Sequence, residues 1–128
     1  MLNRTVEKNG TLARCKELGI RLISYSPIEK GMLSGKYNAN NLPPGSRTGM
    51  YANLLPKLEP LIKLITQIGQ DHGGKSNVQV ALNWVICKGA LPIPGAKNAK
   101  QAEENAGALG WKLKEEEVAR LDEMSDQI

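Results

Sequence analysis

Only two short segments of the sequence predict β-strands, and helical stretches separate them. Residues 20–25 are apolar and partly β-branched and stop before Pro27, and residues 91–94 form an apolar run that contains two prolines. Strands joined through helices are expected to lie parallel. A parallel sheet needs helices on both faces and enough strands to fill the layer between them. Two strands therefore predict an incomplete α/β sheet.

Helical spacing of apolar side chains accounts for most of the remaining sequence. Ser76 with Gln79 three residues later predicts a capping box, and Asn98 is a suitable N-cap for a later helix. The predicted helices are residues 5–17, the stretch between Pro56 and the Gly73-Gly74 pair, residues 76–87, the stretch that starts at Asn98, and residues 115–124. Residues 26–51 are rich in Gly, Pro, Asn and Ser and predict a long loop, which is often functional.

Composition places the chain among ordinary globular proteins. It has 128 residues, of which 41% are hydrophobic and 23% charged, so neither disorder nor a collagen-like fibre is expected. No apolar run has the roughly 18–20 residues that a membrane span requires, and the polar opening lacks the apolar core of a secretory signal. We therefore expect a soluble, intracellular protein without a membrane partner, with no targeting segment in this chain.

Charge and metal-ligand content exclude several kinds of site. The net charge of +4 is scattered and the aromatic residues make up only 4% of the chain, which argues against a nucleic-acid partner. Cys15 and Cys87 lie far apart without a CxxC spacing, so neither a disulfide nor a metal site is expected and both are predicted to be buried or semi-buried free thiols. His72, the one histidine, is predicted to be an exposed residue at a helix end. Trp84 and Trp111 are predicted to lie in the core.

Two clusters of anion-binding residue types follow the two predicted strands. The first is Tyr25-Ser26-Pro27 with Lys30-Gly31 and Lys36, and the second is Gly95 and Lys97 at a helix start. In α/β proteins ligands bind at the carboxyl ends of strands, where helix N-termini favour anions. Each cluster taken alone is also compatible with a solvated surface loop or helix face. Their position after two parallel strands favours a shared site for a phosphate-bearing ligand.

Three segments resemble the carboxyl-terminal part of the aldo-keto reductases: GIRLISYSPIEKGMLSGKY, NVQVALNWVICKG and LPIPGAKNAKQAEENAGALGW. The order of the three motifs matches the family, and the resemblance is strongest to the plant members of plastid type. It implies the chloroplast or the cytoplasm as the location. The resemblance implies an α/β fold that is a carboxyl-terminal fragment of a (β/α)8 TIM barrel. It also implies that residues 1–128 are a partial NADP-dependent oxidoreductase domain that lacks the amino-terminal strands. On this mapping residues 20–25 correspond to the seventh strand and residues 91–94 to the eighth.

The resemblance also implies which residues contact a bound NADPH. Tyr25 would lie near the nicotinamide, and the loop that follows would surround the pyrophosphate. The helix after the second strand would hold the adenosine and its 2′-phosphate. The implied cofactor-binding residues are Tyr25, Ser26, Pro27, Ile28, Gly31, Lys36, Ser46, Arg47, Gly95, Lys97, Gln101, Glu104 and Asn105.

The sequence departs from the family in one respect that determines its function. The resemblance places Met1 just past the sixth strand, and the family's catalytic Asp, Tyr, Lys and His belong to earlier strands, so no residue here receives a catalytic role. We expect a truncated aldo-keto reductase that supplies the NADPH-binding part of an enzyme reducing aldehydes or ketones by hydride transfer. The small carbonyl substrate would bind only in a full-length protein. The alternatives are a non-catalytic nucleotide-binding or accessory protein, with a protein partner at its exposed strand edges, and a fragment without independent function.

Overall fold

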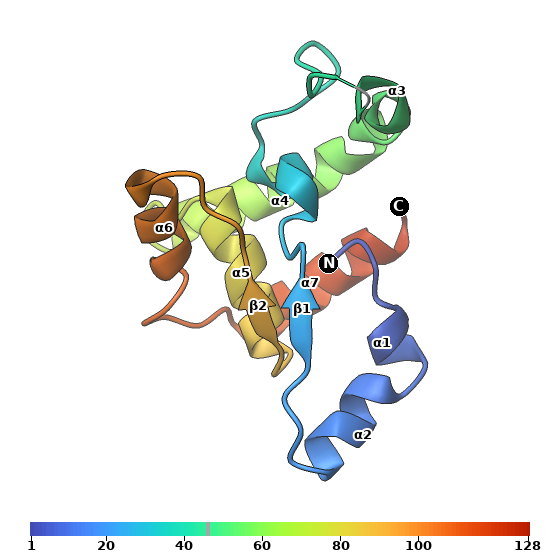
Figure 1. The fold of residues 1–128 in the computed structure, drawn as a ribbon, viewed down its shortest axis with the longest axis vertical. Helices are drawn as coiled ribbons and strands as arrows, with labels where there is room; N and C mark the ends of the chain where they lie inside the picture. The colour runs from blue at the N-terminus through green and yellow to red at the C-terminus, as the bar shows by residue number, and fades with distance from the viewer. Residues whose placement is uncertain (46) are drawn as a thin grey trace.

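A computed structural model of the chain describes residues 1–45 and 47–128, with the backbone alone at Arg47 and Met50. Its elements are, in chain order, α1 (Thr5–Lys8), α2 (Thr11–Glu17), β1 (Ile23–Tyr25), the 3-10 helix η1 (Glu29–Ser34), α3 (Arg47–Ala52), α4 (Leu55–Asp71), α5 (Asn77–Cys87), β2 (Leu91–Ile93), α6 (Ala99–Ala106) and α7 (Glu115–Asp126) (Figure 1). Among the residues described, no helix combines the length and the apolar character needed to cross a membrane.

The two strands form one parallel sheet, as the sequence predicts. Ile23 pairs with Leu91 and Tyr25 with Ile93, and the two arrows lie side by side in Figure 1. Helix α5 packs against β2, so one face of the sheet is covered. By strand alternation Ile23, Tyr25, Leu91 and Ile93 share the opposite face, where they are 45–79% exposed. Leu22 precedes β1 and is half-buried.

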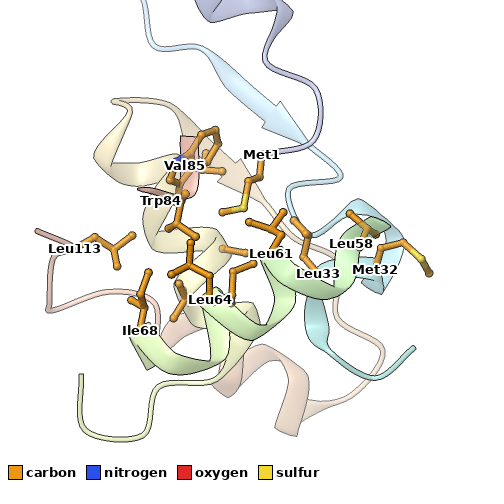
Figure 2. Packing of buried hydrophobic residues seen from close by; sticks show 14 of the residues in the cluster. Met1, Met32, Leu33, Leu58, Leu61, Leu64, Ile68, Trp84, Val85 and Leu113 are labelled. Carbon is orange, nitrogen blue, oxygen red and sulfur yellow. The ribbon is translucent and has the colours of Figure 1, made fainter. Parts of the chain in front are cut away.

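The hydrophobic core lies between helices. The apolar stripe of α4 packs on α5 and α7, and Leu61, Ile65 and Leu121 have no exposed surface. Figure 2 shows this packing around Leu61, Leu64 and Trp84, with Leu33 of η1 inserted at one end. Trp84 is buried as predicted, and Trp111 is partly buried against the same cluster. The core therefore holds η1, and with it the loop after β1, against the helices.

Asn83 on α5 connects the end of α6 to the segment before α7. Its amide nitrogen donates to the backbone carbonyls of Ala108 at 2.9 Å and Trp111 at 3.0 Å, and its oxygen accepts from the Leu113 amide at 3.0 Å. The side chain is only 1% exposed, so these bonds satisfy polar groups that burial would otherwise leave unpaired. Asn83 thereby fixes the chain that follows α6.

Local capping signals account for several helix boundaries. Ser76 and Gln79 form the predicted capping box in both directions, with the Gln79 amide donating to Ser76 Oγ at 3.3 Å and the Ser76 amide to Gln79 Oε1 at 3.0 Å. The helix predicted over residues 5–17 is interrupted, because Gly10 adopts a left-handed φ of +82° between α1 and α2. The loop predicted over residues 26–51 also contains η1 and α3.

The prediction of an exposed His72 is wrong. It does end α4, but its ring is only 19% exposed. Nε2 lies 2.8 Å from a carboxylate oxygen of the buried Glu117, and the ring is tilted by 46° to that of Trp111 with the ring centroids 4.8 Å apart. Local sequence predicts the helix end but not the partner, because Glu117 comes from α7. Cys15 and Cys87 are free and half-buried, as predicted.

The chain leaves β1 through a backbone that L-amino acids rarely adopt. Ser26 and Glu29 have φ values of +47°, Lys30 has +52° and Gly31 has +93°. The Glu29 amide donates to the Ser26 carbonyl at 2.9 Å and the Gly31 amide to the Ile28 carbonyl at 3.0 Å. Left-handed backbone costs roughly 1–2 kcal/mol for a residue with a Cβ. The contacts of the loop with the core must offset this strain.

An ion-pair network joins the amino-terminal segment to α5 and α7. Arg4 pairs with Glu7 and Asp122 at 3.2 Å each, and Lys88 pairs with Glu7 at 2.9 Å and with Asp122. Asp122 also accepts from the Trp84 indole nitrogen at 2.8 Å. Burial by itself raises the pKa of the Glu7 carboxyl, but the hydrogen bonds from Arg4 and Lys88 outweigh it and hold the pKa below its ordinary range.

The Glu7 network predicts acid sensitivity. Because the pKa of Glu7 is lowered in the folded state, the unfolded chain takes up the proton first as the pH falls below about 4.5. The stabilisation is complete above that pH and is lost as the pH falls through the folded-state pKa. The free energy of unfolding of Glu7→Gln should be about 1 kcal/mol lower than that of the original chain at neutral pH. It should also decrease less between pH 5 and pH 3. Urea titration at each pH measures both. Parallel pH profiles for the two proteins would exclude this role of Glu7.

The left-handed loop predicts an inverted order of two substitutions at Lys30. In the interior of a helix or strand, a protein with alanine is more stable than the same protein with glycine by about 0.5–1 kcal/mol. At Lys30 the Gly variant should be the more stable one, by about 1 kcal/mol, because glycine relieves the left-handed strain. Both variants lack the ammonium group, so their difference in urea midpoint isolates the backbone. An alanine variant that is the more stable of the two would contradict the described loop conformation.

Candidate functional site

The structure brings the two predicted clusters to the same end of the sheet. Because Tyr25 pairs with Ile93, the two loops leave the strands at matching positions. The Tyr25 side chain is 79% exposed at this end. The first loop runs into η1 and the second into the N-terminus of α6 (Figure 1). This is the carboxyl end of the strands, where α/β proteins bind their ligands.

A groove lies along β1 between that strand and the amino-terminal segment. Its volume is about 800 Å³, and residues 1–3 and residues 22–27 line opposite parts of it. Glu29 and Lys30 also line it, and both have left-handed backbone. The groove therefore connects the exposed Tyr25 to the loop in which the sequence predicts pyrophosphate contacts.

The second loop is held by side chains of the helix that follows it. Asn98 caps α6 by accepting from the Gln101 amide at 3.0 Å. Gln101 Oε1 accepts from the Lys97 amide at 2.7 Å, and Asn105 Nδ2 donates to the Gly95 carbonyl at 3.3 Å. These contacts occur within one loop and one helix, so the loop is shaped before any ligand arrives.

Helix α6 is itself fixed to α5. The Gln79 side-chain amide donates to the backbone carbonyl of Glu104 at 3.1 Å, and a Cβ on Gly107 would meet that amide nitrogen at 2.2 Å. Gly107 thus permits the close approach of the two helices. Helix α5, which contributes to the hydrophobic core, therefore also holds α6, the helix predicted to bind the adenosine.

The other predicted site residues fall in different surroundings. Pro27 is buried, and the Ile28 side chain packs against the core, so only its backbone is left to contact a ligand. Gly31 lies within η1, and Lys36 is exposed with its ammonium 5.6 Å from the Tyr37 ring. Ser46 lies outside the described residues, and Arg47 is described only as the first backbone position of α3, so neither is placed relative to the site.

Glu29 is a groove residue that sequence reasoning left out of the predicted site, and Lys30 belonged to the first predicted cluster but not to the implied cofactor-binding residues. The Lys30-Gly31 pair was a signal of a ligand loop, but a left-handed Glu29-Lys30 backbone has no local sequence signature, since glycine is the usual residue there. Lys30, Lys36 and Lys97 are all exposed near the two loops. In the described parts of the chain, no ion pair involves these three ammonium groups.

The residues present fit a phosphate-bearing dinucleotide. Three exposed ammonium groups supply positive charge, and the N-terminus of α6 adds the favourable end of a helix dipole. A Cβ added at Gly95 would meet no atom within 4 Å, so that backbone is open to close approach. No group of three or more His, Cys, Asp and Glu side chains suited to a metal ion occurs among the residues described.

The sequence of the chain matches a known protein family and several known proteins. The Aldo/keto reductase family matches residues 1–126. The chloroplastic pyridoxal reductase of Arabidopsis thaliana is 52% identical over 108 residues, which are 84% of this chain and 29% of that protein. A Schizosaccharomyces pombe aldo-keto reductase whose name specifies NADP(+) is 31% identical over 132 residues, covering 91% of this chain and 36% of its own length.

A solved structure supports the fold. The glycerol dehydrogenase of Gluconobacter oxydans superposes with a TM-score of 0.83 at 23% identity, over 95% of this chain and 38% of that one. The chain thus spans 29–38% of the length of these three proteins. It has the fold of a fragment of the aldo-keto reductase barrel, as expected from the sequence. By its match along nearly its whole length, the chain belongs to the aldo-keto reductase family.

Proposed function

We propose that the chain provides the NADPH-binding part of an aldo-keto reductase that reduces an aldehyde or a ketone to an alcohol by hydride transfer. Residues 1–128 are then a partial oxidoreductase domain without the amino-terminal strands. The observation that carries the proposal is the convergence of two cationic, preshaped loops at the carboxyl ends of β1 and β2. Family membership supports a dinucleotide cofactor, and the name of the S. pombe relative supports NADP.

The two loops divide the contacts of the cofactor between them. Tyr25 offers an exposed ring at the strand end, and the loop from Ser26 to Gly31, with Lys36 near it, faces the pyrophosphate. Gly95 and Lys97 meet the adenosine and its 2′-phosphate. From α6, Gln101, Glu104 and Asn105 contribute to the same half of the cofactor. When bound, NADPH supplies the hydride.

The chain's own residues bind and orient but receive no catalytic role. Gln101 and Asn105 hold the backbone of the second loop through the Lys97 amide and the Gly95 carbonyl. In doing so they position the Lys97 ammonium for an anion. The groove beside Tyr25 is open along the amino-terminal segment, so the carbonyl pocket would be completed by parts of a full-length protein.

The Arabidopsis relative suggests a substrate and a compartment. Its name states pyridoxal reduction and a chloroplast location. We propose an aromatic aldehyde of this kind as the carbonyl substrate of the full-length protein, and the chloroplast as its location. These two assignments depend on the relative and not on a residue in the described groove.

A second candidate is a nucleotide-binding accessory protein without turnover. It is favoured by the exposed apolar sheet face, which offers a surface for a protein partner while both cofactor loops remain intact. A stable complex that binds NADPH but does not oxidise it in the presence of aldehydes would support this candidate over the reductase.

Replacing Lys97 tests the cofactor assignment. Lys97→Ala should weaken NADPH binding at least about fivefold while changing NADH binding little, because the 2′-phosphate loses a charge-assisted contact. Lys100→Ala, an exposed lysine on α6, is the matched control and should leave both affinities unchanged. The measurement is fluorescence titration of both cofactors, with circular dichroism showing that each protein is folded. Equal losses for NADPH and NADH, or no saturable binding by the folded chain, would overturn the assignment.

A further inference from the structure

Gln79 uses both ends of its side-chain amide to join two helices. The oxygen accepts from the Ser76 amide at 3.0 Å in the capping box of α5, and the nitrogen donates to the Glu104 carbonyl of α6 at 3.1 Å. These partners fix the orientation of the amide, because a backbone N–H requires the oxygen and a carbonyl requires the nitrogen. A flipped amide would lose both bonds. The residue that caps α5 thus also makes a directed contact with the helix predicted to bind the adenosine.

The Glu104 carbonyl lies in the last turn of α6, where helix carbonyls lose their backbone donors. In a continued helix its donor would be the Ala108 amide. The chain instead turns after Ala106, and the Ala108 amide donates to the Asn105 carbonyl at 3.1 Å. Gln79 supplies a donor from the neighbouring helix in its place. The contact therefore holds the backbone of α6 and not one of its flexible side chains.

Gly107 leaves room for this contact. A Cβ at this position would lie 2.2 Å from Gln79 Nε2 and 3.3 Å from the Glu104 carbonyl oxygen. The φ of Gly107 is −65°, a value that any residue adopts, so the space and not the backbone conformation requires glycine. Gln79 and Gly107 are thus coupled, since a side chain at position 107 would displace the amide.

The contact sets where the second cofactor loop lies relative to the first. Through Gln101 and Asn105, α6 holds the backbone of the second loop. Helix α5 packs against Ile28 of the first loop. We infer that Gln79 is a positioning residue of the cofactor site, acting through α6 rather than by contact with the cofactor. This role rests on the proposed NADPH site and adds to it a residue outside both loops.

Fluorescence titration with NADPH tests this role. Gln79→Ala removes the amide and should raise the NADPH dissociation constant at least about fivefold, a factor that corresponds to the loss of one hydrogen bond. Ser76→Ala is the matched control, because it removes the other bond of the capping box and leaves the contact between Gln79 and Glu104. It should lower the urea midpoint as Gln79→Ala does and leave the affinity unchanged. Equal affinities of the two variants would reduce Gln79 to a helix cap.

A double-mutant cycle with Gly107 tests the coupling. Gly107→Ala should raise the NADPH dissociation constant by about the same factor as Gln79→Ala, because the added methyl group displaces the amide. In the Gln79→Ala background the same change should have no further effect, since the space is then free. Effects of the two substitutions that multiply would contradict the positioning role.

Amide hydrogen exchange without cofactor separates this role from the proposed function. Amides of α6 should exchange at least about fivefold faster in Gln79→Ala, whereas those of α7 should be unchanged. Unchanged exchange in α6, or unchanged NADPH affinity of the variant where the original chain binds saturably, would overturn the role of Gln79 alone. No saturable binding by the folded original chain would overturn the proposed function and this role with it.

Discussion

The packing of α4 against α5 is the interaction on which the rest of the structure depends. A two-stranded sheet encloses no interior, so most buried side chains come from helices. Leu61 of α4 and Trp84 of α5 belong to one core cluster (Figure 2). Large aliphatic side chains that lose all exposure contribute about 1.5–3 kcal/mol each. The chain thus has a helical core to which a short, half-covered sheet is attached.

Helix α5 transmits this order to the candidate site. Its residues Val78 and Leu82 pack with Ile28 of the first loop and with Ala108 beyond α6. Gln79 binds the carbonyl of Glu104, which fixes α6. Both candidate loops are therefore held by the same helix, although about half of the chain separates them in sequence. Ligand loops held in this way lose less entropy on binding than free loops would.

The same arrangement explains why the site is unfinished. The loops depend on α5 and on each other, but the sheet face beside them has no cover in the residues described, and Tyr25 is the most exposed of the large side chains there. A ligand binds more weakly when its direct contacts are kept but the neighbouring segments that hold the contacting residues in place are missing. On the proposed function, we therefore expect the isolated chain to bind NADPH weakly.

The sequence predicted the features that depend on contacts between residues close together in the chain. The capping box at Ser76, the N-cap at Asn98 and the two parallel strands were predicted because each depends on residues close together or on a short apolar run. Contacts between distant segments left no such signal, as the wrongly predicted exposure of His72 shows. The left-handed Glu29-Lys30 backbone was missed because its strain is imposed by the core. The two clusters at the strand ends were predicted from residue types and position, and the family resemblance supplied their roles toward NADPH, which stay predictions.

Amide hydrogen exchange of the purified chain, with and without saturating NADPH, tests the central claim that two distant loops form one cofactor site. The account predicts that NADPH slows exchange together in the loop after β1 and in the loop and first turn of α6. Amides in α7, which is outside the site, should exchange at unchanged rates. Protection confined to one loop, or protection spread evenly over the whole chain, would contradict a shared site at the ends of β1 and β2.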